Sequence, residues 1–458
     1  MIILGTNSIK DTGFDVANSL RFNSASSDYL NRTIGSSTPS TTWTLSCWLK
    51  RSKLGVAQTF LSAAASSAGN NNNLNIKFKA DDSLEYTIIN SGSYNGRRIS
   101  NRLFRDTSAW YNLIFVWDTS NGTAGDRMKV YVNGLQESSF TTTSNPSLNS
   151  TANIAGNIFT VGRPAYTSDA SLDSYIAEVV LLDGTAVSDA TSFGEFDEDS
   201  GIWKPIDVSG LTFGTNGFYL DFEDSSALGN DAAGSNNFTV NNLTAIDQST
   251  DTCTNNFCTI NPLVNGTQRN PTLSEGNTFL TNTSGAWMNC LSSFAASSGK
   301  WYFEIKPTLH GTSYVHAGIF PVDDWQNQVS GYPNFGGTAN SWSYDSDGNI
   351  VNNDGNANTS PATYTTNDII GIAVDLDNNK FYAYKNNALQ VSGGTTITAN
   401  TEYYFGGMGY NSNIAFNFGN PSYANTSDAA DGNGYGAFEF APPSGYYALN
   451  TKNLAEYG

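Results

Sequence analysis

Two closely spaced carboxylates are the first residues in this chain that could do chemistry. Glu195 and Asp197 stand two positions apart in Glu195-Phe-Asp-Glu-Asp, which places both side chains on one face of a strand. Retaining glycosidases need two carboxyl groups about 5 Å apart. The pair lies between Gly194 and Gly201, where a solvated turn is the plainer interpretation. The sequence therefore favours a protein that is not an enzyme, with glycoside hydrolysis kept as an alternative.

The two histidines do not complete a nucleophilic site. His310 and His316 are far from any Gly-x-Ser-x-Gly elbow and from any suitably placed cysteine. His316 falls in a strand-like run two residues before Gly318, so we expect a packed histidine rather than a base.

Oxygen-bearing side chains gather in two places where they could hold a structural Ca²⁺. The candidate ligands are Asp221, Glu223, Asp224 and Asp231 in one group, and Asp345, Asp347 and Asn349 in the other. Neither group supplies the bidentate acid of a calcium loop at its twelfth position, and Asp and Asn are also common in ordinary turns. We expect no cofactor other than such a cation.

Four cysteines are too few for a disulfide scaffold in a chain of 458 residues. Cys253 and Cys258 are spaced to close a short disulfide loop or to supply half of a metal site. Cys47 alternates with Leu45 and Leu49, so we expect it to be a small buried hydrophobe.

Aromatic side chains in polar surroundings are the candidate binding residues. A sugar ring presents an apolar C–H face that stacks on aromatic rings. The candidates for contact with a glycan or receptor are Tyr94, Tyr166, Trp325 and Tyr332. Core packing is the expectation for Trp43, Trp48, Trp110, Trp117 and Trp301.

The composition predicts an all-β protein of more than one domain. The chain has 43 glycines, 13% aromatic and only 14% charged residues, which suits short strands joined by turns. The formal net charge of -19 would repel phosphate backbones, so we expect no nucleic-acid partner. Residues 1–10 lack a basic segment before an apolar run, and no apolar stretch approaches about 18 residues, so we expect neither a signal segment nor membrane insertion.

Strand-like segments recur across residues 19–204 and predict a β-sandwich. They are residues 19–22, 43–50, 59–61, 75–78, 84–89, 110–118, 128–132, 159–161 and 174–182. Alternation in 43–50 predicts one buried face, whereas 110–118 is continuously apolar and should be covered on both sides. Asn133-Gly134 predicts a tight hairpin turn.

A series of motifs follows in order along this region. They are Leu20-Arg-Phe-Asn with Ser27-Asp-Tyr-Leu, Trp43-Thr-Leu-Ser-Cys-Trp-Leu-Lys, Trp110-Tyr-Asn-Leu-Ile-Phe-Val-Trp-Asp, Lys129-Val-Tyr-Val-Asn-Gly and Phe159-Thr-Val-Gly-Arg. The series resembles the concanavalin A-like lectin/glucanase (laminin G-like) family. The resemblance implies a two-sheet antiparallel jelly roll, a fold often used to bind glycans.

Residues 205–272 are expected to form an ordered connector. Phe218, Leu220 and Phe222 alternate within it, which predicts at least one strand. The segment is similar to junctions in structural and tail-fibre-like proteins of tailed bacteriophages. That similarity is the main reason to expect a virion protein.

A second ordered series of motifs runs through residues 273–458. It consists of Ser298-Gly-Lys-Trp-Tyr-Phe-Glu-Ile, Ala317-Gly-Ile-Phe, Ser341-Trp-Ser-Tyr, residues 367–387, Ala415-Phe-Asn-Phe-Gly and Pro442-Pro-Ser-Gly-Tyr-Tyr-Ala-Leu-Asn. This series resembles the SPRY family, whose bent sandwich usually binds another protein through its loops. Residues 369–376 and 380–385 should form a hairpin around Asp377-Asn-Asn.

The sequence therefore predicts two antiparallel β-sandwich (jelly-roll) domains in tandem, at 19–204 and 273–458, after an arm at 1–18 and around the connector. The expected function is attachment to a host-surface glycan or protein by a tail fibre, spike or capsid-surface component of a virion. The alternatives are a capsid or tail decoration protein without a ligand and a polysaccharide-degrading hydrolase. Expected partners are other virion proteins and further copies of the chain, as a trimer, because repeated weak sites multiply avidity.

Overall fold

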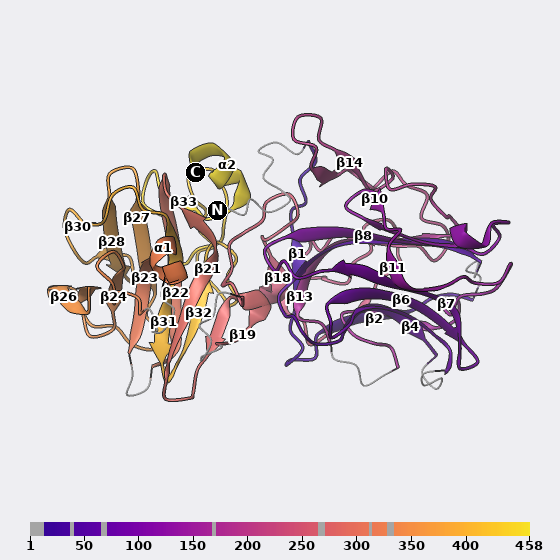
Figure 1. Cartoon of the computed structure of the whole chain (residues 1–458), viewed down its shortest axis with the longest axis horizontal. Helices are drawn as coiled ribbons and strands as arrows, with labels where there is room; N and C mark the ends of the chain where they lie inside the picture. Colours follow the sequence, from indigo (N-terminus) through magenta and orange to yellow (C-terminus); the bar gives the residue numbers. More distant parts are fainter. Residues whose placement is uncertain are drawn as a thin grey trace. The chain divides into compact units, whose positions relative to one another are not determined.

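The structure is a computed structural model that describes residues 13–36, 41–65, 71–166, 171–263, 271–310, 314–327 and 334–458. It is nearly all β, with 44% strand and 5% helix, and the chain divides into two compact units between Thr254 and Asn255 (Figure 1). The predicted connector is therefore not a separate segment. Residues 205–254 belong to the first unit and residues 255–272 to the second.

The first unit contains two eight-stranded antiparallel sheets, here named sheet A and sheet B. In spatial order, sheet A consists of β10 (Leu135–Gln136), β9 (Met128–Val132), β8 (Trp110–Asp118), β3 (Thr42–Arg51), β13 (Ser174–Asp183), β1 (Ser19–Phe22) and β18 (Gln248–Ser249), with β16 (Phe218–Leu220) also paired to β13. Sheet B consists of β11 (Phe140–Ser144), β7 (Ser93–Leu103), β6 (Ser83–Asn90), β5 (Asn73–Phe78), β4 (Gln58–Ala64), β12 (Ile158–Val161), β2 (Tyr29–Thr33) and β17 (Thr239–Asn241). Strands β16, β17 and β18 come from the predicted connector and complete both sheets. A separate hairpin joins β14 (Gly194–Phe196) to β15 (Trp203–Pro205), and short 3-10 turns lie at η2 (Ala124–Asp126) and η3 (Ala245–Asp247).

Alternation along the strands produces the core between the two sheets. On β5, Leu74, Ile76 and Phe78 are fully buried in this core, because every second side chain of a strand points to the same face. In the same core, the ring of Trp43 on β3 stacks on that of Trp117 on the neighbouring strand β8 at 6.3 Å. Cys47 lies in the same core, as predicted.

Sheet A is buried on both faces. Strand β8 was predicted to be covered on both sides, and it is: Phe115 lies in the core between the sheets and Ile114 in a second apolar cluster on the opposite face. For β3 the prediction of one buried face is wrong, because Trp48 lies in the same second cluster as Trp203 of β15. The segment that follows β13 folds back over this face and covers it.

The turn at Asn133-Gly134 forms the predicted hairpin between β9 and β10, with Leu135 opposite Val132. Both turn residues have positive φ, 48° at Asn133 and 79° at Gly134, as a type I′ turn requires. Glycine is also needed here because a Cβ at residue 134 would stand 2.3 Å from the ring of Trp203.

The second unit also contains two sheets, here named sheet C and sheet D. Sheet C consists of β19 (Thr272–Ser274), β20 (Phe279–Thr281), β32 (Ser412–Asn417), β22 (Lys300–His310), β27 (Ile370–Asp375), β28 (Lys380–Lys385) and β29 (Ala388–Leu389), with β30 (Thr395–Thr396) beside β28 and β33 (Tyr447–Ala448) beside β22. Sheet D consists of β21 (Trp287–Ala296), β31 (Tyr403–Tyr410), β23 (Val315–Pro321), β24 (Trp342–Asp345), β25 (Ile350–Asn352) and β26 (Gly355–Asn358). The helices are α1 (Val322–Asn327), α2 (Thr451–Tyr457) and the 3-10 turn η4 (Glu275–Asn277).

Strands β27 and β28 form the predicted hairpin, with Ile370 opposite Lys385 and Asp375 opposite Lys380. Asn379 has the positive φ of a tight turn. The core of this unit is centred on Trp301, Phe303 and Phe405. In the described parts of the chain, neither helix has the length and apolar character needed to cross a membrane.

Candidate functional site

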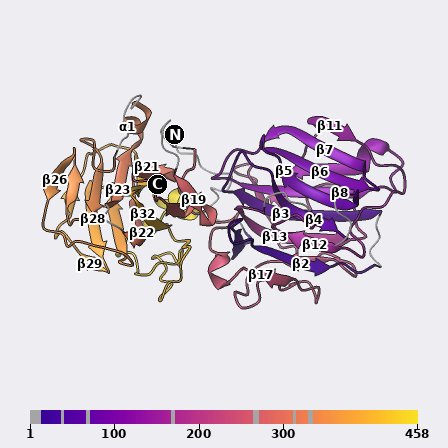
Figure 2. The same cartoon turned by 90° about the horizontal axis from the view of Figure 1, so that it is seen from below.

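One row of residues on the outer face of sheet B is polar across the whole sheet. Residues directly opposite each other on paired strands share a face, and the register connects one residue from each of the eight strands. The row consists of Ser144, Arg97, Thr87, Asn75, Ser62, Thr160, Asn31 and Thr239. We name it the polar row; Figure 2 shows the strands that carry it side by side.

The centre of the polar row is well packed although it faces away from the core. Ser62 and Thr160 are fully buried, and Asn75 and Thr87 are only 5% exposed. Their polar atoms have partners, as buried polar groups require: Ser62 Oγ donates to the carbonyl of Leu74 at 3.0 Å. Thr160 Oγ1 donates to the carbonyl of Arg163 at 2.7 Å. The row is therefore a fixed set of hydroxyl and amide groups.

A charged cluster adjoins the polar row on strands β5, β6 and β7. Nε and Nη2 of Arg97 lie 2.7 and 2.6 Å from Oε1 of Glu85. On the other side, Nζ of Lys77 lies 3.9 Å from Oε2 of the same carboxylate. We name Lys77, Glu85 and Arg97 the charged cluster; one acid is shared between two cations.

Two of the predicted contact residues lie beside these groups. Tyr94 is 52% exposed, and the guanidinium of Arg97 lies 4.3 Å from the centre of its ring. The hydroxyl of Tyr166 accepts a hydrogen bond from Nδ2 of Asn75 at 3.2 Å. Sheet B thus brings Tyr94 and Tyr166 to the face that carries the polar row.

The other two predicted contact residues are not part of this face. Trp325 belongs to α1 of the second unit and packs edge-on against Phe320 at 6.3 Å. Tyr332 lies outside the described residues. The sequence interpretation missed one further ring, Tyr29 on β2. The guanidinium of Arg163 lies over this ring, at 3.6 Å from its centre.

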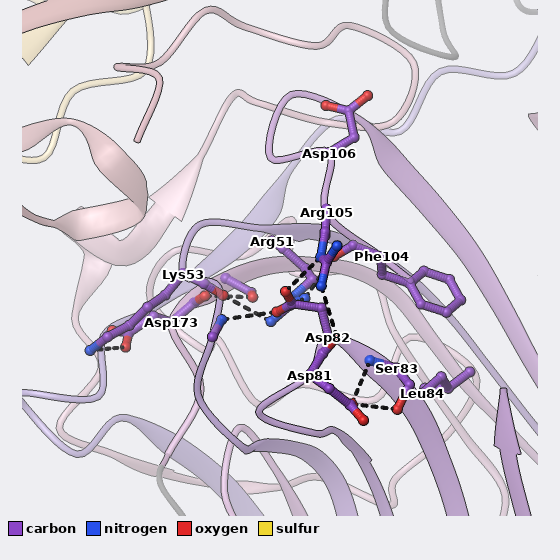
Figure 3. Close-up of polar contacts among 12 residues, drawn as sticks. Arg51, Lys53, Asp81, Asp82, Ser83, Leu84, Phe104, Arg105, Asp106 and Asp173 are labelled. Carbon is purple, nitrogen blue, oxygen red and sulfur yellow. Dashed lines mark hydrogen bonds and ion pairs between the residues drawn. The ribbon is translucent and has the colours of Figure 1, made fainter. Parts of the chain in front are cut away.

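A polar network holds the turn between β5 and β6, at the end of the strands that carry Lys77 and Glu85 (Figure 3). Asp82 Oδ1 accepts hydrogen bonds from Nη1 of Arg51 at 3.0 Å and from the amide of Gly55 at 2.9 Å, and Oδ2 accepts one from Nε of Arg105 at 3.1 Å. Arg51, on β3 of sheet A, also donates to the carbonyl of Phe104 at 2.6 Å. The network therefore joins the two sheets at this end of the sandwich.

The charge of Asp82 is stabilised by its partners. Burial raises the pKa of this carboxyl, but the Gly55 amide and the guanidinium groups of Arg105 and Arg51 together bring the pKa below its ordinary value. Its φ of 68° is a left-handed conformation in which glycine is the usual residue. The acid in this turn is a sequence signal for a turn residue only, because its partner Arg51 lies 31 positions away in the chain.

The carboxylates considered for catalysis lie elsewhere, on the hairpin of β14 and β15. Nζ of Lys204 lies 3.3 Å from Oε1 of Glu195 and 3.6 Å from Oδ2 of Asp197. Glu195 is 58% exposed at its side chain, and Asp197 also accepts from the hydroxyl of Ser200 at 2.7 Å. Two acids that share one lysine on a small hairpin fit the turn that the sequence also suggested.

The predicted calcium ligands of the first unit are used for hydrogen bonds within turns. Asp231 accepts from the backbone amides of Tyr219, Ala233 and Asn236. Asp224 accepts from the amide and hydroxyl of Ser226. Asp221 accepts from the amide of Glu223 at 3.2 Å, and burial raises its pKa.

In the second unit, Asp345 accepts from the backbone amide and the Nδ2 group of Asn349, and Asp347 is exposed. Over the residues that the structure describes, no group of three or more His, Cys, Asp or Glu side chains is arranged to hold a metal ion. The donors present fit turn stabilisation better than cation binding.

The remaining chemistry-bearing residues are buried. Cys253 and Cys258 are free thiols in the structure, so the considered disulfide is absent, and they belong to different units. His316 packs against Trp287, and burial lowers its pKa to about 3. It is therefore a neutral packed histidine, as predicted.

Two buried glutamates were missed by sequence interpretation. Burial raises the pKa of Glu178 to about 8, and its Oε2 accepts a hydrogen bond from the hydroxyl of Tyr219 at 2.6 Å. Burial raises the pKa of Glu304 to about 7, and its carboxylate accepts from the amides of Glu439 and Phe440. Each is enclosed by its own unit, which makes both structural residues.

Comparison with known families assigns both units. Residues 24–190 match the concanavalin A-like lectin/glucanases superfamily, and residues 300–421 match the SPRY domain. The chain therefore contains a concanavalin A-like domain followed by a SPRY domain, and the resemblances to these two families are confirmed. These matches indicate a binding function. No curated protein matches the chain significantly.

Several solved structures are similar to part of this chain. A native heptameric SAP-like pentraxin from Limulus polyphemus is 17% identical, with 38% of this chain and 80% of that chain covered and a TM-score of 0.29. The SPRY domain of human HERC1 is 17% identical, with 30% and 87% covered and a TM-score of 0.25. A second human SPRY domain is 18% identical, with 30% and 90% covered and a TM-score of 0.23.

Proposed function

We propose that the first unit binds a saccharide on the outer face of sheet B. The observation that carries this proposal is the exposed ring of Tyr94, which lies against the guanidinium of Arg97 at a partly exposed position of the polar row. The match to a superfamily that includes lectins supports the same ligand class.

The chemistry of this face suits a sugar. Saccharides present hydroxyl groups that donate and accept hydrogen bonds, and serine, threonine and asparagine side chains can do both. They also present apolar C–H faces that stack on aromatic rings. Because the centre of the polar row is buried, contacts with a ligand come from its less buried positions, Asn31, Arg97, Ser144 and Thr239.

Affinity measurements on a polysaccharide panel test this proposal. We expect Tyr94→Ala to weaken binding by on the order of tenfold, because it removes the exposed ring beside the polar row. Phe196→Ala is the matched control, since Phe196 is also an exposed ring, 45% accessible, but lies on β14. Equal losses in the two variants, or no binding of any saccharide by the intact chain, would count against the proposal.

We further propose, as the setting of this activity, host attachment by a tail or capsid-surface component of a tailed phage, with the SPRY unit contacting another protein through its loops. Support comes from the sequence similarity of residues 205–272 to phage tail-fibre-like junctions. Antibody labelling of particles would test the location. Binding to virus shells but not to cells or polysaccharide would favour a decoration protein instead, and release of reducing ends would favour a hydrolase.

Self-association also stays a prediction. A trimer would raise avidity without any new contact. Light scattering coupled to size-exclusion chromatography should give about three times the chain mass of 49.1 kDa, and a monomer mass would contradict it.

A further inference from the structure

The outer face of strands β4 to β7 carries the opposite charge to the chain as a whole. The sequence has 41 acidic against 22 basic residues. On the outward positions of strands β4 to β7, however, Glu85 is the one acid among the described residues, whereas Lys77 and Arg97 are both basic. This part of the face therefore has an excess of one positive charge within a strongly acidic protein.

The cations of the charged cluster are held rather than free to move. The side chains of Lys77, Arg97 and Glu85 are only 20%, 23% and 8% exposed. Partial burial strengthens charge interactions relative to those in open water. Since Glu85 is shared by both cations, the cluster has an excess of one positive charge beside the ring of Tyr94.

We propose that the saccharide bound on this face is acidic, with a carboxylate that pairs with the charged cluster. This inference rests on the proposed saccharide-binding function and names its ligand class. A guanidinium matches the planar geometry of a carboxylate. A uronic-acid ring beside Tyr94 can direct its carboxylate toward the guanidinium of Arg97, which lies over the tyrosine ring at 4.3 Å from its centre. Lys77 is paired with Glu85 on the neighbouring strand.

Two polymers that differ only in charge test the proposal. We expect the chain to bind polygalacturonate at least about tenfold more tightly than its fully methyl-esterified form, and this preference to fall as salt is raised. Equal or tighter binding of the ester would overturn the acidic ligand while leaving saccharide binding intact. Binding of no polysaccharide would overturn the proposed function itself.

Substitutions in the charged cluster should change the preference for the acidic polymer in opposite directions. Lys77→Gln and Arg97→Gln should each reduce the preference for polygalacturonate over its ester, because each removes one cation. Glu85→Gln should increase it, because it removes the competing carboxylate.

Arg102→Gln is the matched control. Arg102 is a half-exposed arginine on the same strand that pairs with Glu137 at 2.9 Å. Thermal unfolding of each variant checks that the fold is kept. The Lys77→Gln variant, which removes the longer 3.9 Å contact with Glu85, tests the proposal if Arg97→Gln fails to fold. A preference that is unchanged in both Lys77→Gln and Glu85→Gln would overturn the assignment.

Discussion

Arg51 on sheet A places its Nη1 3.0 Å from Oδ1 of Asp82, in the turn that ends strand β5 of sheet B. The arginine side chain is fully buried and the aspartate side chain is 8% exposed. The two residues come from different sheets, so this ion pair fixes the sheets relative to each other next to the charged cluster.

Removing Asp82 should destabilise the first unit strongly. Asp82→Ala leaves the guanidinium of Arg51 buried without its carboxylate, and breaking such a pair costs about 3–5 kcal/mol. Asp82→Gly removes the carboxylate without adding backbone strain, because glycine readily adopts the positive φ found here. It therefore tests the effect of the lost charge alone. Denaturant unfolding should show both variants destabilised; an unchanged Asp82→Gly variant would show that the ion pair contributes little.

Arg105, the other partner of Asp82, should matter less. Its side chain is 59% exposed, and exposed ion pairs contribute about 0–1 kcal/mol. Arg105→Ala should therefore lower the free energy of unfolding by less than about 1 kcal/mol. A loss as large as that of Asp82→Ala would reverse the relative importance of the two arginines.

Gly134→Ala should destabilise the hairpin of β9 and β10. The new Cβ would stand 2.3 Å from Cε3 of Trp203, and the residue has a φ of 79°. Overpacking of this kind costs about 1–3 kcal/mol. Gly122→Ala, where no atom lies within 4 Å of the new Cβ, is the control and should change the melting temperature little.

Glu178 should make the stability of the first unit fall as pH rises. Burial raises its pKa from the ordinary 4.5 to about 8. Between these values the unfolded chain releases a proton that the folded chain keeps, so the free energy of unfolding decreases with rising pH. The contribution of the protonated Glu178 to stability is fully present below about pH 4.5 and is lost as the pH rises through about 8.

Glu178→Gln tests this dependence. The amide keeps an oxygen that can accept from Tyr219 but does not titrate. Urea unfolding at pH 5 and pH 8 should show a drop for the wild type that exceeds the drop for the variant by on the order of a few kcal/mol. Equal drops in the two proteins would show that Glu178 titrates normally.

The fold could be predicted largely from alternating apolar residues. Strands β1, β8 and β9 begin and end where the pattern placed them, because each has apolar residues that reach the core. Strand β7 was missed because its inward positions include Gly96 and Arg98 rather than large apolar side chains.

The strands of residues 205–254 were assigned to a connector for a different reason. They pair with strands far away in the sequence, as Leu220 of β16 does with Val179 of β13. Nothing in the local pattern indicates such long-range pairing.

The candidate site could likewise be predicted where it depends on local sequence but not where it depends on long-range pairing. Tyr94 and Tyr166 were identified singly as rings in polar surroundings, which local sequence can show. The polar row was not predicted, because it exists only through the register of eight strands. Asp82 and Arg51 were missed since residues 31 positions apart give no local sign that they will pair.

The most direct test of saccharide binding by sheet B is a crystal structure of the chain with the oligosaccharide that it binds most tightly. We predict a sugar ring stacked on Tyr94 or Tyr166, with hydroxyl groups within hydrogen-bonding distance of the partly exposed residues of the polar row, such as Arg97. A sugar bound only to the loops of the second unit, with the outer face of sheet B empty, would contradict the proposal.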